Sequence, residues 1–261
     1  MGEYVQLGAV KTWYDEKGGE GEPLVMLHGG LVDSRWFDPN IDAFTEHFHV
    51  YLPERRGHGH TPDVEGPISY QLMADDTIAF LETVVREPVD LLGHSDGAFV
   101  ATLIGMQRPD LVKRLVLISG GFSKEGEAMP DAPWDVDAIT QFLGHAYGEV
   151  SPDGEDHFRV VATKIGDMAA REPHLAASEL NAIQARTLVM FADDDLVTLT
   201  HSVQMYDAIP NAEFAVVPGT SHFLTQEKPE LVNRIVLDFL LNEPVPLVAP
   251  IRRANPSASP A

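Results

Sequence analysis

A serine flanked by small residues is the clearest chemical feature of the sequence. The pentapeptide Gly93-His94-Ser95-Asp96-Gly97 follows an apolar run of strand length, Val89 to Leu92, and opens a helical pattern over Ala98 to Met106. A sharp turn between a strand and a helix lifts such a serine clear of the sheet, and glycines two positions before and after it let the two elements approach closely. We therefore predict that Ser95 is a nucleophile that attacks a carbonyl carbon.

Four more segments with chemically useful groups follow apolar runs of strand length. They are His28-Gly29-Gly30, Arg56 to Thr61, Ala192-Asp193-Asp194-Asp195 and Gly219-Thr220-Ser221-His222. Together with the turn at Ser95, and in this order, they resemble the α/β-hydrolase superfamily, serine esterase type, over about residues 3 to 242. The resemblance implies acyl transfer through a Ser-His-Asp triad, without a cofactor.

The resemblance assigns the other two members of the triad. His222 would be the general base, because the superfamily carries its histidine after the last strand. Asp195 would orient that histidine, since the superfamily's usual pattern is Gly-Asp-x-Asp with the last aspartate catalytic. Ala192 replaces the glycine of this pattern, and Asp194 is the alternative acid.

The residue after the nucleophile departs from the usual pattern, because Asp96 stands where an uncharged residue is common. The oxyanion hole would use the backbone N–H of Asp96 and that of Gly30, with Leu31 as the alternative to Gly30. The Asp96 carboxylate either turns away to accept hydrogen bonds or binds a cationic group of the substrate. The Ser-Asp-Gly sequence resembles the valacyclovir hydrolases, whose corresponding aspartate holds an α-amino group. Further substrate-binding residues are expected at Trp134, Phe142 and Phe223.

The remaining histidines near these motifs are interpreted as structural. His28 and His94 flank the site, and hydrogen bonds to loop backbone account for such residues. His58 and His60 lie two positions apart without a further histidine or carboxylate in ligand spacing, so no metal site is predicted there. The sequence has no cysteine, which excludes disulfides, thiolate catalysis and cysteine-ligated metals.

Alternating apolar runs and helical patterns predict the elements that position these residues. Apolar runs without polar alternation suit strands buried on both faces. One helical pattern places Ala74, Ile78, Leu81 and Val85 on one face after a plausible N-cap, Ser69. The fold class predicted is α/β, a mostly parallel eight-stranded sheet with helices on both faces. The predicted inner strands are Leu24 to Leu27, Val50 to Leu52, Val89 to Leu92, Leu115 to Ile118, Leu188 to Phe191 and Phe214 to Val217.

The ends and the middle of the chain depart from this alternation of strands and helices. Tyr4 to Leu7 and Val10 to Tyr14 flank Gly8-Ala9, which predicts an antiparallel hairpin at the sheet edge. Helical pieces rich in aromatic residues predict an inserted helical cap over residues 122–181, between core segments 1–121 and 182–242. Residues 243–261 are rich in proline and are expected to form a flexible tail.

The composition limits the partners. Forty acidic and eighteen basic residues give a formal charge of −22, which would repel nucleic acids and anionic membranes. Solubility accounts for such a charge, and a bias toward neutral or cationic substrates is the alternative interpretation. The N-terminus lacks the basic start and apolar stretch of a secretory signal, and no apolar run is long enough to span a bilayer. We expect a cytoplasmic monomer or homodimer that binds a small-molecule ester.

The expected activity is carboxylic-ester hydrolysis through an acyl-enzyme on Ser95. Alternatives with the same fold are hydrolysis of amino-acid esters or amides, lactones, or carbon–carbon bonds, because all use the same nucleophile. Dehalogenases and epoxide hydrolases of this fold carry an aspartate nucleophile, so the serine disfavours them. A non-catalytic ligand receptor that keeps the triad is a third alternative.

Overall fold

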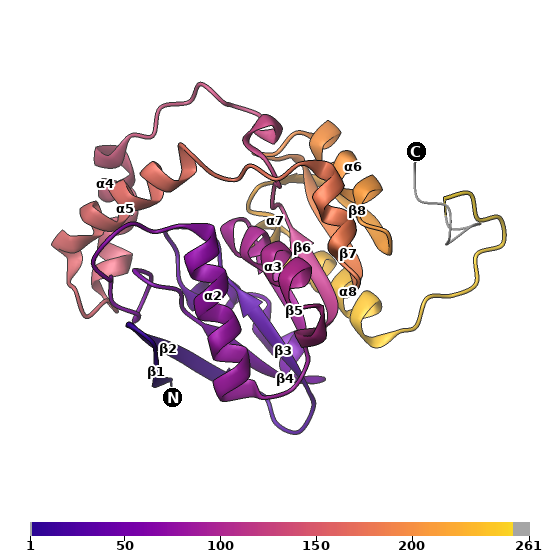
Figure 1. Cartoon of the computed structure of the whole chain (residues 1–261), viewed down its shortest axis with the longest axis horizontal. Helices are drawn as coiled ribbons and strands as arrows, with labels where there is room; N and C mark the ends of the chain where they lie inside the picture. Colours follow the sequence, from indigo (N-terminus) through magenta and orange to yellow (C-terminus); the bar gives the residue numbers. More distant parts are fainter. Residues whose placement is uncertain (1, 253–261) are drawn as a thin grey trace.

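The computed structural model describes residues 2–252, which form one eight-stranded sheet (Figure 1). The strand order is β1-β2-β4-β3-β5-β6-β7-β8. The first two strands form an antiparallel hairpin, β2 is antiparallel to β4, and the pairs from β4 to β8 are all parallel. The strands are β1 (Glu3–Leu7), β2 (Val10–Lys17), β3 (Glu22–Leu27), β4 (Phe48–Pro53), β5 (Val89–His94), β6 (Val112–Ile118), β7 (Arg186–Asp194) and β8 (Ala212–Ser221). The predicted α/β sheet and its edge hairpin are confirmed.

The parallel strands separate two hydrophobic cores. Successive side chains of a strand point to opposite faces. In β3, Val25 and Leu27 accordingly belong to one core, while Leu24 and Met26 belong to the other. This burial on both faces is why the inner strands appear in the sequence as uninterrupted apolar runs.

Helices cover both faces of the sheet. Residues of α2, α3 and α6 contribute to the first core, whereas those of α1 and α8 contribute to the second. The predicted helix begins as expected, because the Ser69 side chain accepts a hydrogen bond from the backbone N–H of Leu72. Ile78 is only half-buried, and the last turn, Leu81–Val85, is a π-helix. The α-helices of the core are α1 (Ile41–Thr45), α2 (Tyr70–Phe80), α3 (Asp96–Gln107), α6 (Leu199–Ala208), α7 (Leu224–Glu227) and α8 (Pro229–Leu241).

Between β6 and β7 the chain forms two more helices, α4 (Val136–Gly148) and α5 (Phe158–Ala169). They lie side by side, with long connections to the rest of the chain (Figure 1). Phe158 and Met168 are buried, whereas Phe142 is 83% exposed. We call residues 122–181 the helical insertion; its assignment as a cap, like the boundaries of the core segments, stays a prediction.

The C-terminal region has no regular structure where it is described. Residues 243–252 contain no helix or strand, and residues 253–261 of the predicted tail lie outside the described residues. Within residues 2–252, no helix is both long enough and apolar enough to cross a membrane.

Candidate active site

Ser95 sits on a strained turn between β5 and α3. Its backbone adopts φ 55° and ψ −122°, a conformation that non-glycine residues rarely adopt. A Cβ atom on Gly93 would lie 2.2 Å from the carbonyl oxygen of Gly97, and one on Gly97 would lie 2.2 Å from that of Leu27. Both glycines are therefore required by close packing of the strand, the turn and the helix, as the pentapeptide predicted.

Ser95, His222 and Asp195 form a chain of hydrogen bonds. Ser95 Oγ lies 2.9 Å from His222 Nε2, and His222 Nδ1 lies 2.7 Å from Asp195 Oδ1. With the proton on Nδ1, the histidine donates to the carboxylate and accepts from the serine. The structure thus brings together three residues that are 27 to 127 positions apart in the chain.

The Asp195 carboxylate is held by two further donors. Its side chain is fully buried, and its Oδ2 atom accepts hydrogen bonds from Ser119 Oγ at 2.5 Å and from the backbone N–H of Ala192 at 3.0 Å. Burial alone would raise the pKa of Asp195, but the bonds from His222 and Ser119 outweigh it and lower that pKa. Ser119 was not singled out from the sequence; only its position after β6 could have indicated it.

The neighbouring aspartates do not contact His222. Asp193 is exposed and accepts a hydrogen bond from the backbone N–H of Thr220 at 3.0 Å. Bonds from the backbone of Gly219 and Thr220 lower the pKa of Asp193. Asp194 is exposed as well. Among the three consecutive aspartates, Asp195 is therefore the one in position to orient the histidine.

The loop after β3 lies against the turn that holds Ser95. A Cβ atom on Gly29 would lie 3.3 Å from Ser95 Cβ, and one on Gly30 would lie 2.3 Å from Asp96 Oδ2. Within residues 2–252, the loop hydrogen bonds do not use the backbone N–H of Gly30, Leu31 or Asp96. These N–H groups are therefore available to an oxyanion beside Ser95.

The Asp96 side chain is held from the opposite side by a tyrosine. Tyr70, at the start of α2, donates its hydroxyl proton to Asp96 Oδ1 at 2.6 Å. Burial and the charge of Asp96 raise the pKa of Tyr70 well above its usual value, so the tyrosine is a neutral donor. Sequence reasoning missed Tyr70 because only the tertiary packing of α2 on α3 brings it to the site.

The structural interpretation of His28 and His94 agrees with their contacts. His94 Nε2 lies 2.9 Å from the carbonyl oxygen of His222, and His28 Nδ1 lies 2.7 Å from that of Gly29. Burial lowers the pKa of His94 to about 3 and that of His28 well below its usual value, so both rings are neutral. His60 contacts Glu54 at 3.0 Å, but the described part of the chain contains no group of three possible metal ligands.

A cavity of about 880 Å³ opens beside Ser95 and His222. Trp134, Phe142 and Phe223, which were expected to bind substrate, all line it, together with residues of the helical insertion. Its lining includes three carboxylates and, among the described residues, no lysine or arginine. The carboxylates belong to Asp96, Glu127 and Glu172.

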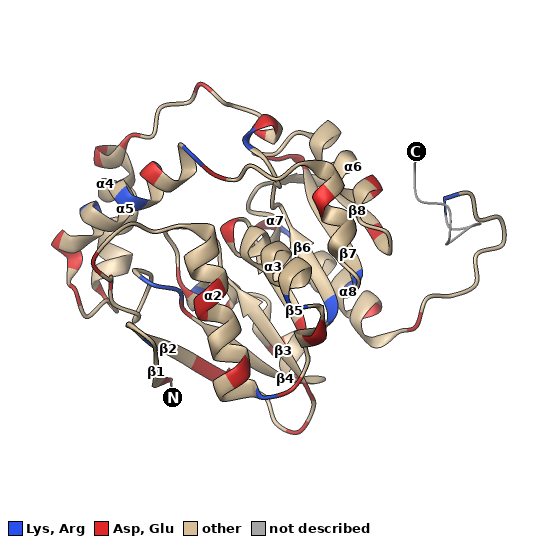
Figure 2. Ribbon diagram, viewed as in Figure 1, with Lys and Arg blue, Asp and Glu red and all other residues tan. Residues whose placement is uncertain are grey.

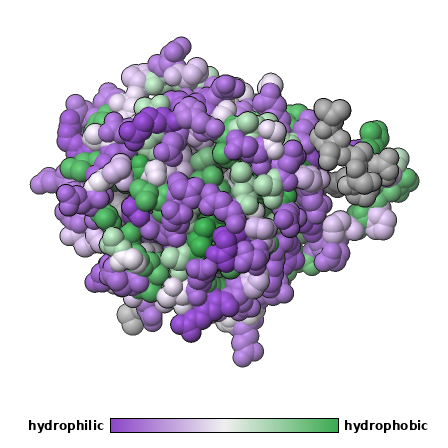
Figure 3. Space-filling model, viewed as in Figure 1, coloured by the Kyte–Doolittle hydropathy of each residue, from purple (hydrophilic) through white to green (hydrophobic). Residues whose placement is uncertain are grey.

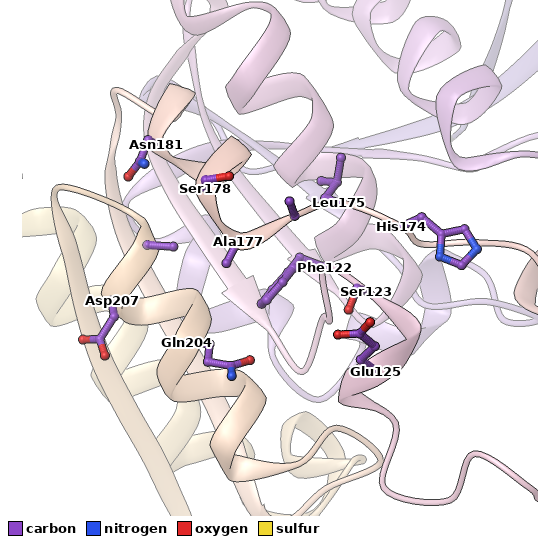
Figure 4. A pocket seen from close by; sticks show the side chains of 12 residues that line it. Phe122, Ser123, Glu125, His174, Leu175, Ala177, Ser178, Asn181, Gln204 and Asp207 are labelled. Carbon is purple, nitrogen blue, oxygen red and sulfur yellow. The ribbon is translucent and has the colours of Figure 1, made fainter. Parts of the chain in front are cut away.

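A second cavity, of about 640 Å³, lies between α6 and the segments that connect the insertion to the core (Figure 4). Figure 4 shows Phe122 at its centre between Gln204 of α6 and Leu175. Of its lining residues, only Ser123 also lines the cavity at Ser95. Because neither Ser95 nor His222 reaches it, this second cavity is not part of the candidate active site.

Comparison with known proteins decides the family. The model of the alpha/beta hydrolase family matches residues 24–235, which include Ser95, Asp195 and His222. The chain belongs to this family. The expected superfamily is therefore confirmed, and the strained turn at Ser95 lies within the matched residues of this alpha/beta hydrolase.

Related hydrolases are named for different substrates. The alpha/beta hydrolase described here is 25% identical over 92% of its length to an (E)-2-((N-methylformamido)methylene)succinate hydrolase of Acinetobacter baylyi, of which 98% is covered. It is 27% identical over 88% of its length to a 2-hydroxy-6-oxononadienedioate/2-hydroxy-6-oxononatrienedioate hydrolase of Paraburkholderia phymatum, of which 91% is covered.

The fold is shared with solved structures of the family. The enol-lactonase of Burkholderia xenovorans LB400 superposes with a TM-score of 0.74 at 19% identity, covering 92% of this chain and 100% of that one. These findings establish a hydrolase of the alpha/beta fold.

Proposed function

We propose that this hydrolase cleaves carboxylic esters of small or medium size through an acyl-enzyme on Ser95. The observation that carries the proposal is the hydrogen-bonded chain from Ser95 through His222 to Asp195, which opens on the cavity of about 880 Å³. A serine, a histidine and a buried carboxylate in this geometry provide a nucleophile, a base and an orienting group.

The proposed reaction has two halves. Ser95 Oγ attacks the ester carbon while its proton moves to His222 Nε2, and the Asp195 carboxylate stabilises the resulting imidazolium. The oxyanion of the tetrahedral intermediate accepts hydrogen bonds from the N–H groups of Gly30 and Asp96. His222 then returns the proton to the departing alcohol, and a water molecule activated in the same way releases the acid and Ser95.

Replacement of the nucleophile tests this proposal. Ser95→Ala should lower kcat for a chromogenic acetate ester by about 10⁴-fold or more, because the remaining groups cannot form an acyl-enzyme. The thermal unfolding temperature should not fall, since alanine fits the turn. Turnover by the variant within about tenfold of the parent would contradict the proposal. Absence of turnover by the parent on esters and lactones, with ligand binding intact, would favour the receptor alternative.

A second candidate, hydrolysis of α-amino-acid esters, is favoured by the charge of the cavity. Asp96 lies next to the nucleophile, Glu127 and Glu172 also line the space, and no described lining residue carries a positive side chain. Asp96 and Glu172 accept hydrogen bonds from neutral groups of Tyr70, which leave their negative charges in place, whereas Glu127 lies 3.9 Å from Lys124. Carboxylates in the wall of an apolar pocket attract a cationic group and repel an anionic one. The two relatives named above act on a succinate and on nonadienedioates. The acidic lining is unsuited to such dicarboxylates.

The charge of Asp96 can be tested with matched substrates. Asp96→Ala should lower kcat/KM for an α-amino-acid ester relative to an uncharged ester of equal size, by about tenfold or more. The loss should appear mainly in KM, because the ammonium group is bound in the ground state. Glu125→Ala is the control, because Glu125 is exposed and does not line the cavity at Ser95. An unchanged ratio would mean that Asp96 acts only in the scaffold.

A further inference from the structure

Arg55 is a buried cation beside the expected oxyanion hole, and none of the steps above uses it. It lies just after β4 and is 3% exposed. Its Nη2 atom donates hydrogen bonds to the carbonyl oxygens of His28 at 2.5 Å and Gly29 at 2.7 Å. Within residues 2–252, its Nε and Nη1 atoms are buried without a hydrogen-bond partner.

These two bonds fix the orientation of the loop that carries Gly30. In a trans peptide the C=O and N–H bonds point in opposite directions. Because the Gly29 carbonyl faces Arg55, the N–H group of Gly30, which belongs to the same peptide, faces away from Arg55. That peptide lies against Ser95 and Asp96, as the close approaches of the two glycines show.

A peptide between two glycines rotates easily, because neither side has a Cβ atom to oppose the turn. If the Gly29–Gly30 peptide flipped, it would present a carbonyl oxygen to the oxyanion in place of an N–H donor. A negative carbonyl dipole would then oppose the charge that develops in the reaction. Some interaction must therefore hold this peptide. Two groups contact its carbonyl oxygen, Arg55 Nη2 at 2.7 Å and His28 Nδ1 at 2.7 Å, and only Arg55 brings a positive charge.

The energetic cost of Arg55 also points to a function. A buried cation with two unpartnered nitrogen groups is expensive, and an apolar side chain would fill the same volume without that cost. Burial lowers the pKa of Arg55 to about 10, partly offset by the negative charge of Asp96, so the side chain remains cationic at neutral pH. Side chains that are unfavourable for stability, such as a buried cation with unpartnered nitrogens, are found mainly at functional sites.

We propose that Arg55 is the positioning residue of the oxyanion hole: by holding the carbonyls of His28 and Gly29 it keeps the N–H of Gly30 directed at the developing oxyanion. Arg55 touches neither the substrate nor the reacting atoms, so it acts through the peptide. The inference rests on the proposed function, because it assigns a residue that supports the same reaction.

The test compares two adjacent arginines. Arg55→Met should lower kcat for an uncharged acetate ester by about 10² to 10³-fold, the typical cost of losing one oxyanion donor, and should change KM by less than about threefold. Arg56→Met is the matched control, because Arg56 forms an ion pair with Asp76 at 2.7 Å and does not contact the loop. Its kcat should stay within about threefold of the parent.

A transition-state analogue separates positioning from general damage. A trifluoromethyl ketone forms a tetrahedral oxyanion on the serine, so its inhibition constant should rise in Arg55→Met by the factor by which kcat/KM falls. Rates should be expressed per active serine, counted with a fluorophosphonate label. Arg55→Met with kcat and inhibition constant both within about threefold of Arg56→Met would overturn the proposal.

A double variant covers the case in which Arg55→Met does not fold. Arg55→Met/Asp96→Asn removes two opposite charges together and leaves no new unpaired carboxylate. It should remain about tenfold or more slower than Asp96→Asn alone, and equal rates would overturn the positioning role. If the parent itself neither turns over esters nor takes the serine label, the proposed function fails. An active parent with a fully active Arg55 variant contradicts only the role of Arg55.

Discussion

At the scale of single residues, the end of β7 determines which aspartate can meet His222. The pairing of β7 with β8 shifts register between Ala192 and Asp194, and the strand ends at Asp194. Asp195 then leaves the sheet and turns back, so that its carboxylate accepts the N–H of Ala192. This turn, and not the composition of the acidic run, places one carboxylate behind the histidine.

Asparagine substitutions test this placement. Asp195→Asn should lower kcat by about 10³ to 10⁴-fold, because an amide cannot stabilise the imidazolium and favours the wrong histidine tautomer. Asp193→Asn, at an exposed position two residues earlier, should change kcat by less than about tenfold. The measurement is kcat for one uncharged ester across both variants. Equal losses would move the orienting acid to another residue.

The sequence predicts the residues that belong to local motifs and misses those that reach the site from elsewhere. Ser95 and His222 each follow a strand within a short characteristic segment, so their meeting could be anticipated. Ser119, Tyr70 and Arg55 contact the site through side chains from the end of β6, α2 and the loop after β4. No spacing rule relates such positions, because tertiary packing alone brings them together.

At the scale of elements, two polar clusters join the helical insertion to the core. Arg35 donates to the carbonyl oxygen of Ala146 at 2.6 Å and pairs with Glu149 at 2.8 Å, at the end of α4. Asp63 binds Lys164 of α5 at 2.7 Å and His157 at 2.9 Å. Both clusters therefore tie the helical insertion to the core, one at the end of α4 and one at α5.

The Asp63 cluster should make stability depend on pH. Bonds from Lys164 and His157 outweigh the effect of burial and lower the pKa of Asp63 below 3.8. A carboxylate with a lowered pKa in the folded state stabilises the protein above its unfolded pKa and loses this effect as pH falls through the folded value. At pH 7, Asp63→Asn should therefore cost about 2 kcal/mol, or a fall of about 4–8 °C in Tm.

Thermal unfolding at two pH values measures this effect. The difference in Tm between the parent and Asp63→Asn should be full at pH 7 and should shrink as the pH falls below 3.8 toward the lowered pKa of Asp63. Asp137→Asn is the control, because the Asp137 side chain is 78% exposed and its pair with Arg159 should contribute little. A difference that does not change with pH would show that Asp63 acts through packing alone.

The elements themselves were largely predictable, and their packing was less so. Strand positions and the Ser69 cap follow from local patterns, because both depend on neighbouring residues. The half-buried position of Ile78 was not predictable, since it depends on how α2 is rotated against the sheet. Within residues 122–181, the helical spacing of Phe158, Val161, Ile165 and Met168 indicates α5. The path of the connecting segments was not predictable, because it depends on tertiary contacts with the core.

At the scale of the whole molecule, acidic residues dominate. Figure 2 shows Asp and Glu on most of the elements in view, with Lys and Arg at fewer positions. On the same face, hydrophobic residues are scattered among hydrophilic ones (Figure 3). With a formal charge of −22, the molecule attracts cations and repels anions over distances of about a Debye length.

The electrostatic field of the molecule should make kcat/KM for charged substrates depend on the salt concentration. Raising the ionic strength from about 0.02 to 0.5 M should lower kcat/KM for a cationic ester by about threefold or more and raise it for an anionic ester. An uncharged ester of similar size should show little change and serves as the control. Identical salt profiles for all three esters would mean that the net charge does not guide substrates to the site.

The order of the strands has a consequence for how the site assembles during folding. Ser95 follows β5, but its hydrogen-bonded partners Asp195 and His222 follow β7 and β8, the last two strands in the chain. Pairing between segments far apart in sequence is the slow part of forming such a sheet. In a growing or partly refolded chain, Ser95 therefore lacks its hydrogen-bond partner His222 until β8 pairs with β7. Recovery of catalysis would then report completion of the whole sheet, whereas circular dichroism would register helices that form earlier.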